Sequence, residues 1–210
     1  IRIVVPYPPG GVTDLVGRVV ADGLRERHGW AAVVDNKPGA NGQIGMAEVA
    51  RARADGHTLL IGGLGSHVIP PALSPTFPFD VPRDFTRIAK VAEFVNVMVV
   101  NPQSPARTPA DFVALAKAKP DEMNYGSSGI GASNHLTAAL FALETGISMT
   151  HVPARGAPAS ILALRQGEIH VIFENLPAVR GQIADGALKP LAVTSGYRSR
   201  YLPDVPTLAE

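Results

Sequence analysis

Residues 1–24 read IRIVVPYPPGGVTDLVGRVVADGL, and this segment indicates the class of fold. It begins with an apolar run at 1–5, which is typical of a buried strand, and a turn rich in proline and glycine follows at 6–11. The next segment shows helical spacing of apolar residues. We expect its buried face to consist of Leu15, Val16, Val19, Val20 and Leu24. A strand, a turn and a helix in this order are typical of an α/β fold.

The same alternation continues along the chain. Strands are expected at 31–35 and 57–61, with a helix at 43–54 between them. After a proline-rich stretch, a second cycle begins with a strand at 95–100. Its later elements are strands at 123–125, 148–151, 169–173 and 188–194 and helices at 109–117, 133–144, 158–165 and 176–183. Two successive cycles predict two lobes, each with a mainly parallel sheet covered by helices on both faces, and crossing segments near 95–100 and 191–195.

Composition excludes several classes of function. The chain is 46% hydrophobic and 18% charged, which is typical of a globular protein, and 19 Lys and Arg against 18 Asp and Glu leave a net charge of +1. This balance of charges gives no overall electrostatic field that would attract nucleic acid or an anionic membrane. No apolar run approaches the ~20 residues of a membrane span. With 0 Cys and no pair of the six histidines at ligand spacing, we expect no metal, no cofactor and no cysteine nucleophile.

The loop after the first strand has the chemistry of an anion site. Gly10 and Gly11 allow a sharp turn, and the helix that follows presents free N–H groups and the positive end of its dipole. A carboxylate fits such a position. The alternative is a plain turn in which Thr13 or Asp14 caps the helix.

A second loop, at 125–135, combines three glycines with the hydroxyls of Ser127 and Ser128. It lacks the Lys-Ser/Thr of a phosphate-binding P-loop, and Asn134 breaks the dinucleotide-binding glycine pattern. Ile130 stands where a nucleophile elbow requires glycine, so a serine hydrolase is not supported. The sequence therefore predicts an anion nest in which Ser128 donates to a ligand carboxylate.

A third loop, at 152–158, contains Arg155, which is suited to gripping a carboxylate through two hydrogen bonds. The alternative is a solvated arginine. The pairs at 66–67 and 174–175 also follow expected strands, and each can equally cap the next helix.

Taken in order, these motifs cover essentially the whole chain. They are IRIVVPYPPGG at 1–11 with Asp14, VDNKPGANG at 34–42, ADGHTLL at 54–60, NYGSSG at 124–129, HVP at 151–153, LAVTS at 191–195 and LPDVPT at 202–207. In this set the chain resembles the Bug family, the periplasmic solute-binding subunits of tripartite tricarboxylate transporters. It departs from the family at Ala154, where an aromatic residue is usual.

The resemblance implies a two-lobed periplasmic-binding-protein-like fold that captures a small carboxylate in the interlobe cleft and delivers it to membrane permease subunits. Lobe 1 is then expected at 1–97, completed by 196–210 and by a segment beyond residue 210, and lobe 2 at 98–195. The expected location is the periplasm, with the signal peptide absent from this chain. The expected ligand-binding residues are Pro9, Gly10, Gly11, Thr13, Asp14, Ser66, His67, Ser127, Ser128, Gly129, Gly131, Ala132, His135, Arg155, Gly156 and Glu174.

Two other functions remain open from the residues. One is an α/β enzyme acting on a small carboxylic acid with Glu174 or His135 as base, although no tuned acid–base pair or nucleophile can be identified. The other is a sensory ligand-binding subunit with the same pocket. A dicarboxylate, an aromatic acid and an amino acid all remain candidate ligands, since Asp14 or Glu174 can accept from an ammonium group.

Overall fold

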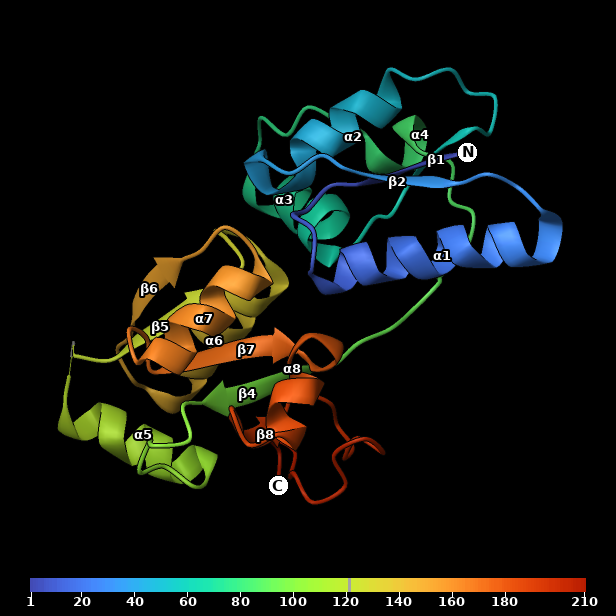
Figure 1. The fold of residues 1–210 in the computed structure, drawn as a ribbon. Coiled ribbons are helices and arrows are strands. Elements are labelled where there is room, and N and C mark those ends of the chain that lie inside the picture. The colour runs from blue at the N-terminus through green and yellow to red at the C-terminus, as the bar shows by residue number, and fades with distance from the viewer. Residues whose placement is uncertain (121) are drawn as a thin grey trace. The chain divides into compact units, whose positions relative to one another are not determined.

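The computed structural model describes residues 1–120 and 122–210, which form two compact units (Figure 1). Unit 1 comprises Ile1–Glu93 and Gly131–Ser133, and unit 2 comprises Phe94–Ile130 and Asn134–Glu210. The main boundary thus lies between residues 93 and 94, whereas the sequence predicts it between 97 and 98. The difference arises because the strand at 96–100 pairs along its whole length inside unit 2.

Unit 1 is built on a parallel three-stranded sheet in the order β2-β1-β3. The strands are β1 (Arg2–Val5), β2 (Val33–Asn36) and β3 (Thr58–Leu60). The helices of this unit are α1 (Val12–His28), the 3-10 helix η1 (Ala40–Gly42), α2 (Gln43–Ala50), the π-helix η2 (Leu64–Val68), α3 (Ile69–Leu73) and α4 (Val81–Asp84). In Figure 1, α1 and α2 lie on opposite sides of β1 and β2. The predicted alternation of strands and helices is therefore confirmed.

Helix α1 buries a different face from the one that its apolar spacing predicts. Leu15 is 49% exposed and Val19 is 63% exposed, so the prediction of a buried Leu15–Val19 face is wrong for these two residues. The buried positions of α1 are Asp14, Gly17 and Ala21. An ideal Cβ at Gly17 would lie 2.7 Å from Val5 Cγ2, which shows how closely the helix approaches β1. Small residues, and not large apolar ones, make this approach feasible.

Unit 2 contains a five-stranded sheet in the order β6-β5-β7-β4-β8. Its strands are β4 (Asn96–Val100), β5 (Asn124–Ser127), β6 (Thr150–Pro153), β7 (Val171–Asn175) and β8 (Lys189–Val193), and its helices are α5 (Pro109–Ala118), α6 (Ser133–Thr145), α7 (Ala157–Gln166) and α8 (Leu176–Ala184). Strand β4 is antiparallel to both of its neighbours, whereas β5 is parallel to β6 and to β7. The sheet is thus mixed, with two parallel and two antiparallel pairings, whereas the sequence predicts a mainly parallel sheet; the difference arises because β4 alone runs opposite to the other four strands.

Alternate residues of the central strands pack into two separate cores. Met98 and Val100 lie in a cluster with residues of α5 and α6, such as Phe112 and Phe141. Val97 and Val99 lie in the other cluster, with residues of α7 and α8. This alternation is the consequence of the two-residue period of a strand. Helices therefore cover both faces of the unit 2 sheet.

Residues 196–210 belong to unit 2 in this structure. The backbone N–H of Val193 donates to Pro206 O at 2.8 Å, and the N–H of Leu208 donates to Val193 O at 3.0 Å. The segment thus extends the edge of the sheet at β8, whereas the sequence analysis expects it to complete the first lobe. Completion of unit 1 by residues beyond 210 stays a prediction. Within the described ranges, no helix has both the length and the apolar character that crossing a membrane requires.

Helix α5 begins with a reciprocal pair of side-chain hydrogen bonds. Thr108 Oγ1 accepts from the N–H of Asp111 at 3.1 Å, and Asp111 Oδ2 accepts from the N–H of Thr108 at 3.0 Å. We expect Thr108→Ala to lower the free energy of unfolding by about 1 kcal/mol, the usual loss for a helix cap. Urea denaturation followed by circular dichroism tests this. Thr108→Ser keeps the acceptor oxygen and serves as the control, so equal losses in the two variants would contradict the assignment.

Candidate functional site

In unit 1 the parallel strands bring the loops after β1 and β3 to one edge of the sheet, where ligands of open α/β sheets bind. The loop at 6–11 leads into α1, whose N-cap is Gly11. Gly11 has no side chain to cap the helix, and Gly10 has a φ of 84°, which favours glycine. Neither Thr13 nor Asp14 is the cap, so that alternative from the sequence analysis is wrong. The first turn of α1 therefore has no side-chain acceptor at its N-cap.

Asp14 is 4% exposed and holds the loop from inside the unit. Its Oδ2 accepts from the N–H of Gly10 and from Arg18 Nε, both at 3.0 Å, and its Oδ1 accepts from Asn36 Nδ2 at 3.0 Å. Burial raises the pKa of this carboxyl, but the hydrogen bonds from Arg18, Gly10 and Asn36 outweigh burial and lower the pKa below its ordinary value. Asp14 thus links the loop to the end of β2, and its oxygens already have partners within the unit.

Ser66 and His67 lie in the π-helix η2, directly beyond β3. Ser66 is fully buried, and its Oγ lies 2.7 Å from His67 Nδ1 and accepts from the N–H of Gly63 at 3.3 Å. The His67 ring packs edge-on against Phe85, with ring centroids 5.6 Å apart, and burial lowers the pKa of His67. Each of these two side chains thus has a hydrogen-bond partner within unit 1. A π-helical turn at this edge is itself a feature that recurs at functional sites.

In unit 2 three loops follow the parallel strands β5, β6 and β7 at one edge of the sheet. Backbone hydrogen bonds join the first two loops, from the N–H of Ala154 to Ser127 O at 3.0 Å and from the N–H of Gly156 to Ser128 O at 3.2 Å. Gly129 and Gly156 have φ values of 143° and 99°, which only glycine adopts readily. The structure therefore brings Ser127, Ser128, Gly129 and Gly156 together, as the sequence predicts.

The Ser127 side chain is enclosed within its own loop. Ser127 is fully buried, and its Oγ accepts from the N–H of Gly129 at 3.1 Å and lies 2.7 Å from His151 Nε2. The rings of His135 and His151 stack with their centroids 4.0 Å apart. Burial and the nearby His135 lower the pKa of His151 to about 4. At neutral pH this imidazole is therefore uncharged, and Ser127 shapes the loop through it.

A second network joins Ser128, Asn134 and Glu174. Asn134 Nδ2 donates to Ser128 Oγ and to Glu174 Oε2, each at 2.8 Å, and its Oδ1 accepts from the N–H of Ser128 at 3.2 Å. Ser128 Oγ donates to Glu174 Oε2 at 3.2 Å. The other oxygen of Glu174 accepts from Asn175 N at 2.9 Å and from Asn175 Nδ2 at 3.1 Å. Glu174, which is 2% exposed, thus receives four hydrogen bonds.

The environment of Glu174 has opposing effects on its ionisation. Burial raises the pKa of this carboxyl, and the hydrogen bonds from Asn175, Asn134 and Ser128 counteract that rise only in part. All the donors converge on its two oxygens, so the carboxylate is built into the loop edge. It is not an open acceptor for a ligand ammonium group.

The remaining predicted residues differ in accessibility. Arg155, Pro9 and Gly10 are exposed, His135 is half-buried, and Gly131, Ala132 and Gly156 are buried. Within residues 1–120 and 122–210, no ion pair involves Arg155, and the guanidinium of this exposed residue is accessible from solvent. Among the same residues, no cluster of three acidic or histidine side chains has the arrangement of a metal site.

Sequence analysis missed His151 and Asn134. The sequence motifs give His151 no role in the site, whereas in the structure His151 on β6 lies beside β5 in the parallel register that pairs it with Tyr125. Asn134 was used only to reject a glycine motif. Its position in the first turn of α6, next to the glycine loop, was the signal that could have identified it.

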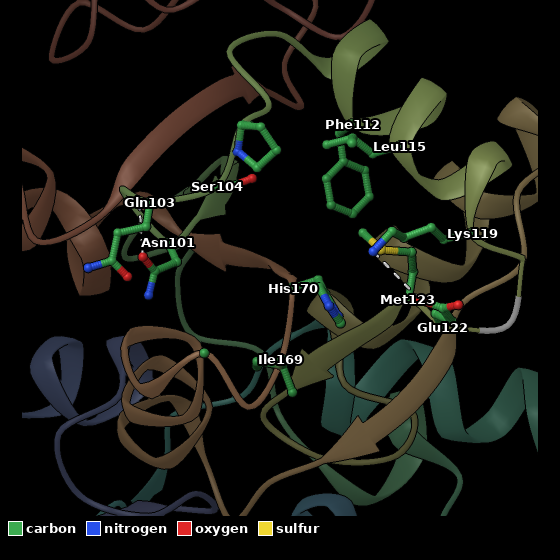
Figure 2. Close-up of a pocket in the computed structure, with 12 residues that line it drawn as sticks. Asn101, Gln103, Ser104, Phe112, Leu115, Lys119, Glu122, Met123, Ile169 and His170 are labelled. Atoms are coloured by element: carbon green, nitrogen blue, oxygen red, sulfur yellow. Dashed lines mark hydrogen bonds and ion pairs between the residues drawn. The ribbon is translucent and has the colours of Figure 1, made fainter.

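A separate cavity of about 320 Å³ lies at the opposite edge of the unit 2 sheet (Figure 2). Met123, Ile169 and His170 line it directly before β5 and β7 begin, together with Phe112 of α5. It contains no residue that the sequence predicts for the ligand site. The predicted site therefore consists of loops at the carboxyl edge, and this cavity is distinct from it.

Two α/β units, each with glycine turns and polar loops beyond parallel strands, define the class of periplasmic-binding-protein-like folds. The chain belongs to the protein family described as "Tripartite tricarboxylate transporter family receptor", whose model matches residues 16–210. This family comprises solute-binding receptors, so the resemblance identified from the sequence motifs is confirmed.

Individual relatives agree with this assignment. The protein BugT of Bordetella pertussis is 36% identical over 211 residues, which cover 100% of this chain and 65% of BugT. Among solved structures, R. palustris Rpa4515 with adipate is 35% identical with a TM-score of 0.96, and MatC from Rhodopseudomonas palustris with bound malate is 27% identical with a TM-score of 0.92. Both matches cover 100% of this chain, and they cover 70% and 71% of the respective structures.

Proposed function

We propose that this chain is the ligand-capturing part of a periplasmic receptor that binds a small carboxylate and delivers it to the permease subunits of a tripartite tricarboxylate-type transporter. The observation that carries the proposal is the set of amide- and hydroxyl-bearing loops at the carboxyl edges of the strands. It occurs in a chain that shares 35% identity and a TM-score of 0.96 with a protein solved with adipate. The chain spans 65% of the length of BugT, so delivery and partners are proposed for the whole receptor.

Each unit by itself has a feature suited to holding an anion. In unit 1 the backbone N–H groups at the start of α1 provide partial positive charge. In unit 2 Arg155 provides a full charge that no acidic side chain of the described residues neutralises. Charge-assisted hydrogen bonds of this type are stronger than neutral ones. The proposed ligand is therefore an anion with at least one carboxylate.

The alternative of an enzyme with Glu174 or His135 as base has no favouring observation. The oxygens of Glu174 are occupied by four donors, and the ring of His135 stacks against His151 while burial lowers its pKa. A sensory subunit would share the binding loops and differ in its partner. Co-purification with permease subunits, and not with a signalling protein, would distinguish transport from sensing.

The direct test is a thermal-shift screen of the purified chain against adipate, malate, succinate, benzoate and aspartate, together with the amide of each acid. A ligand that binds only the folded state raises the melting temperature by mass action. We expect one or more acids to shift the transition and their amides to leave it unchanged. Equal shifts by an acid and its amide, or conversion of the acid to a product, would overturn the proposal.

Arg155 provides a more specific prediction. We expect Arg155→Gln to weaken carboxylate binding about tenfold, because a hydrogen-bonded charge is lost while the loop backbone is retained. Titration calorimetry with the acid identified in the screen measures the change. Arg165→Gln, on the last turn of α7, removes an equal charge from the same unit and serves as the control. Equal affinity of the Arg155 variant and the wild type would remove Arg155 from the site.

A further inference from the structure

The single hydrogen of the Ser128 hydroxyl is already committed within unit 2. A serine hydroxyl donates one hydrogen bond and accepts through two lone pairs. Ser128 Oγ donates to Glu174 Oε2 at 3.2 Å and accepts from Asn134 Nδ2 at 2.8 Å. One lone pair of Ser128 Oγ is therefore left, and Ser128 itself is half-buried at the edge of its loop.

The direction of these bonds is fixed by the surrounding donors. Asn134 must keep its Nδ2 toward Ser128 Oγ and Glu174, since its Oδ1 accepts from the N–H of Ser128 at 3.2 Å. The other partners of Glu174 are the backbone N–H and the side-chain amide of Asn175, which can only donate. Every neighbour of Glu174 thus favours its acceptor form, and Ser128 must donate to it.

We propose that Glu174 is a positioning residue that makes Ser128 a hydrogen-bond acceptor, so that the receptor selects carboxylates that carry a hydrogen-bond donor, a hydroxyl or an ammonium group, beside the carboxylate. The inference rests on the proposed function. It also reassigns Ser128, which the sequence analysis expects to donate to the ligand carboxylate. The carboxylate itself is then bound by the loop amides and Arg155.

The hydrogen-bond geometry of Ser128 gives this selectivity its direction. A second ligand carboxylate near Ser128 would meet an oxygen that offers it no hydrogen. A hydroxyl or an ammonium group does not meet this penalty. Dicarboxylates that differ only in such a group are therefore the natural probes.

The experiment compares matched acids by titration calorimetry: malate and aspartate against succinate, and 2-hydroxyadipate against adipate. The wild-type chain is expected to bind at least one donor-bearing acid about tenfold more tightly than its matched acid, the effect of one additional hydrogen bond. A hydroxyl donor and an ammonium donor are distinguished by the malate and aspartate arms.

Glu174→Gln tests the positioning role. Its amide nitrogen can donate to Ser128 Oγ, which frees the serine hydrogen for the ligand, so the affinity ratio is expected to fall to about one or to invert. Ser128→Ala removes the acceptor and is also expected to bring the ratio to about one. Glu168→Gln, an exposed residue just before β7, is the control and is expected to retain the wild-type ratio. Melting temperatures establish that each variant is folded.

The outcomes separate the two proposals. If each matched pair binds the wild-type chain with equal affinity, the selectivity is overturned while carboxylate binding stands. If both variants keep the wild-type ratio, Glu174 and Ser128 do not determine it. If none of these acids or the screened acids binds, the proposed function fails, and the selectivity fails with it.

Discussion

Gly45→Ala is expected to destabilise unit 1 by about 2 kcal/mol, although alanine is the better helix former. Gly45 lies in α2, and an ideal Cβ there would lie 2.9 Å from Pro6 Cβ, 3.0 Å from Pro6 Cα and 3.1 Å from Lys37 O. Two of these atoms belong to backbone, which cannot rotate away. Overpacking of this type costs about 1–3 kcal/mol. The loops after β1 and β2 would have to shift, so ligand binding is expected to weaken as well.

The matched control is Gly23→Ala in α1, where a Cβ meets nothing within 4 Å. This substitution is expected to stabilise the unit by up to about 1 kcal/mol, since glycine is a poor helix former. Urea denaturation followed by the fluorescence of Trp30, the only tryptophan of the chain, reports on unit 1. Equal signs for the two variants would contradict the close approach of α2 to the loops.

Asp14→Ala is expected to lower the free energy of unfolding by about 2–3 kcal/mol. The substitution removes the acceptor of the Gly10 N–H and one of the two acceptors of the Asn36 amide, which keeps its hydrogen bond to Tyr7 O at 3.1 Å. Each unsatisfied polar group costs about 1–3 kcal/mol where water cannot replace it. Asp22→Ala, on the exposed side of the same helix, is the control. A loss for Asp14→Ala no larger than that of the control would show that Asp14 does not hold the loop.

The contribution of Asp14 also depends on pH. Its pKa is lower in the folded protein than in the unfolded chain, so its stabilisation is fully present above the ordinary aspartate pKa of about 3.9. It is lost as the pH falls through the lowered pKa of the folded state. The difference in stability between wild type and Asp14→Asn is therefore expected to be constant between pH 5 and 7 and to shrink toward pH 3. A constant difference over the whole range would contradict the lowered pKa.

The strands and the two-lobed architecture could be predicted from the sequence because apolar runs alternate with glycine and proline turns. The buried face of α1 could not, since the close approach at Gly17 depends on small residues that carry little hydrophobic signal. The end of α2 could not be predicted either: the helix ends at Ala50, although the apolar pattern suggests a helix to residue 54. Such ends depend on packing that a local pattern does not contain.

The loop glycines and serines of the candidate site could also be predicted, because the chain motifs place them directly after strands. The hydrogen-bond partners of the serine hydroxyls could not be predicted. Ser127 and Ser128 find their partners 24 and 46 residues away, in His151 and Glu174. Only the order of β5, β6 and β7 in the sheet brings these side chains together.

The two cores of unit 2 have a consequence for strand pairing. Val97 and Val99 face one core and Met98 faces the other, so a slip of β4 by one residue would exchange one apolar set for another and cost little polar burial. Register must therefore be fixed outside the apolar pattern. At one end of β4 the Thr194 hydroxyl accepts from the backbone N–H of Asn96 and donates to Asn96 O, and at the other Asn101 Nδ2 donates to two carbonyl oxygens at the end of α7. The Thr194 hydroxyl and the Asn101 amide thus keep β4 in alignment.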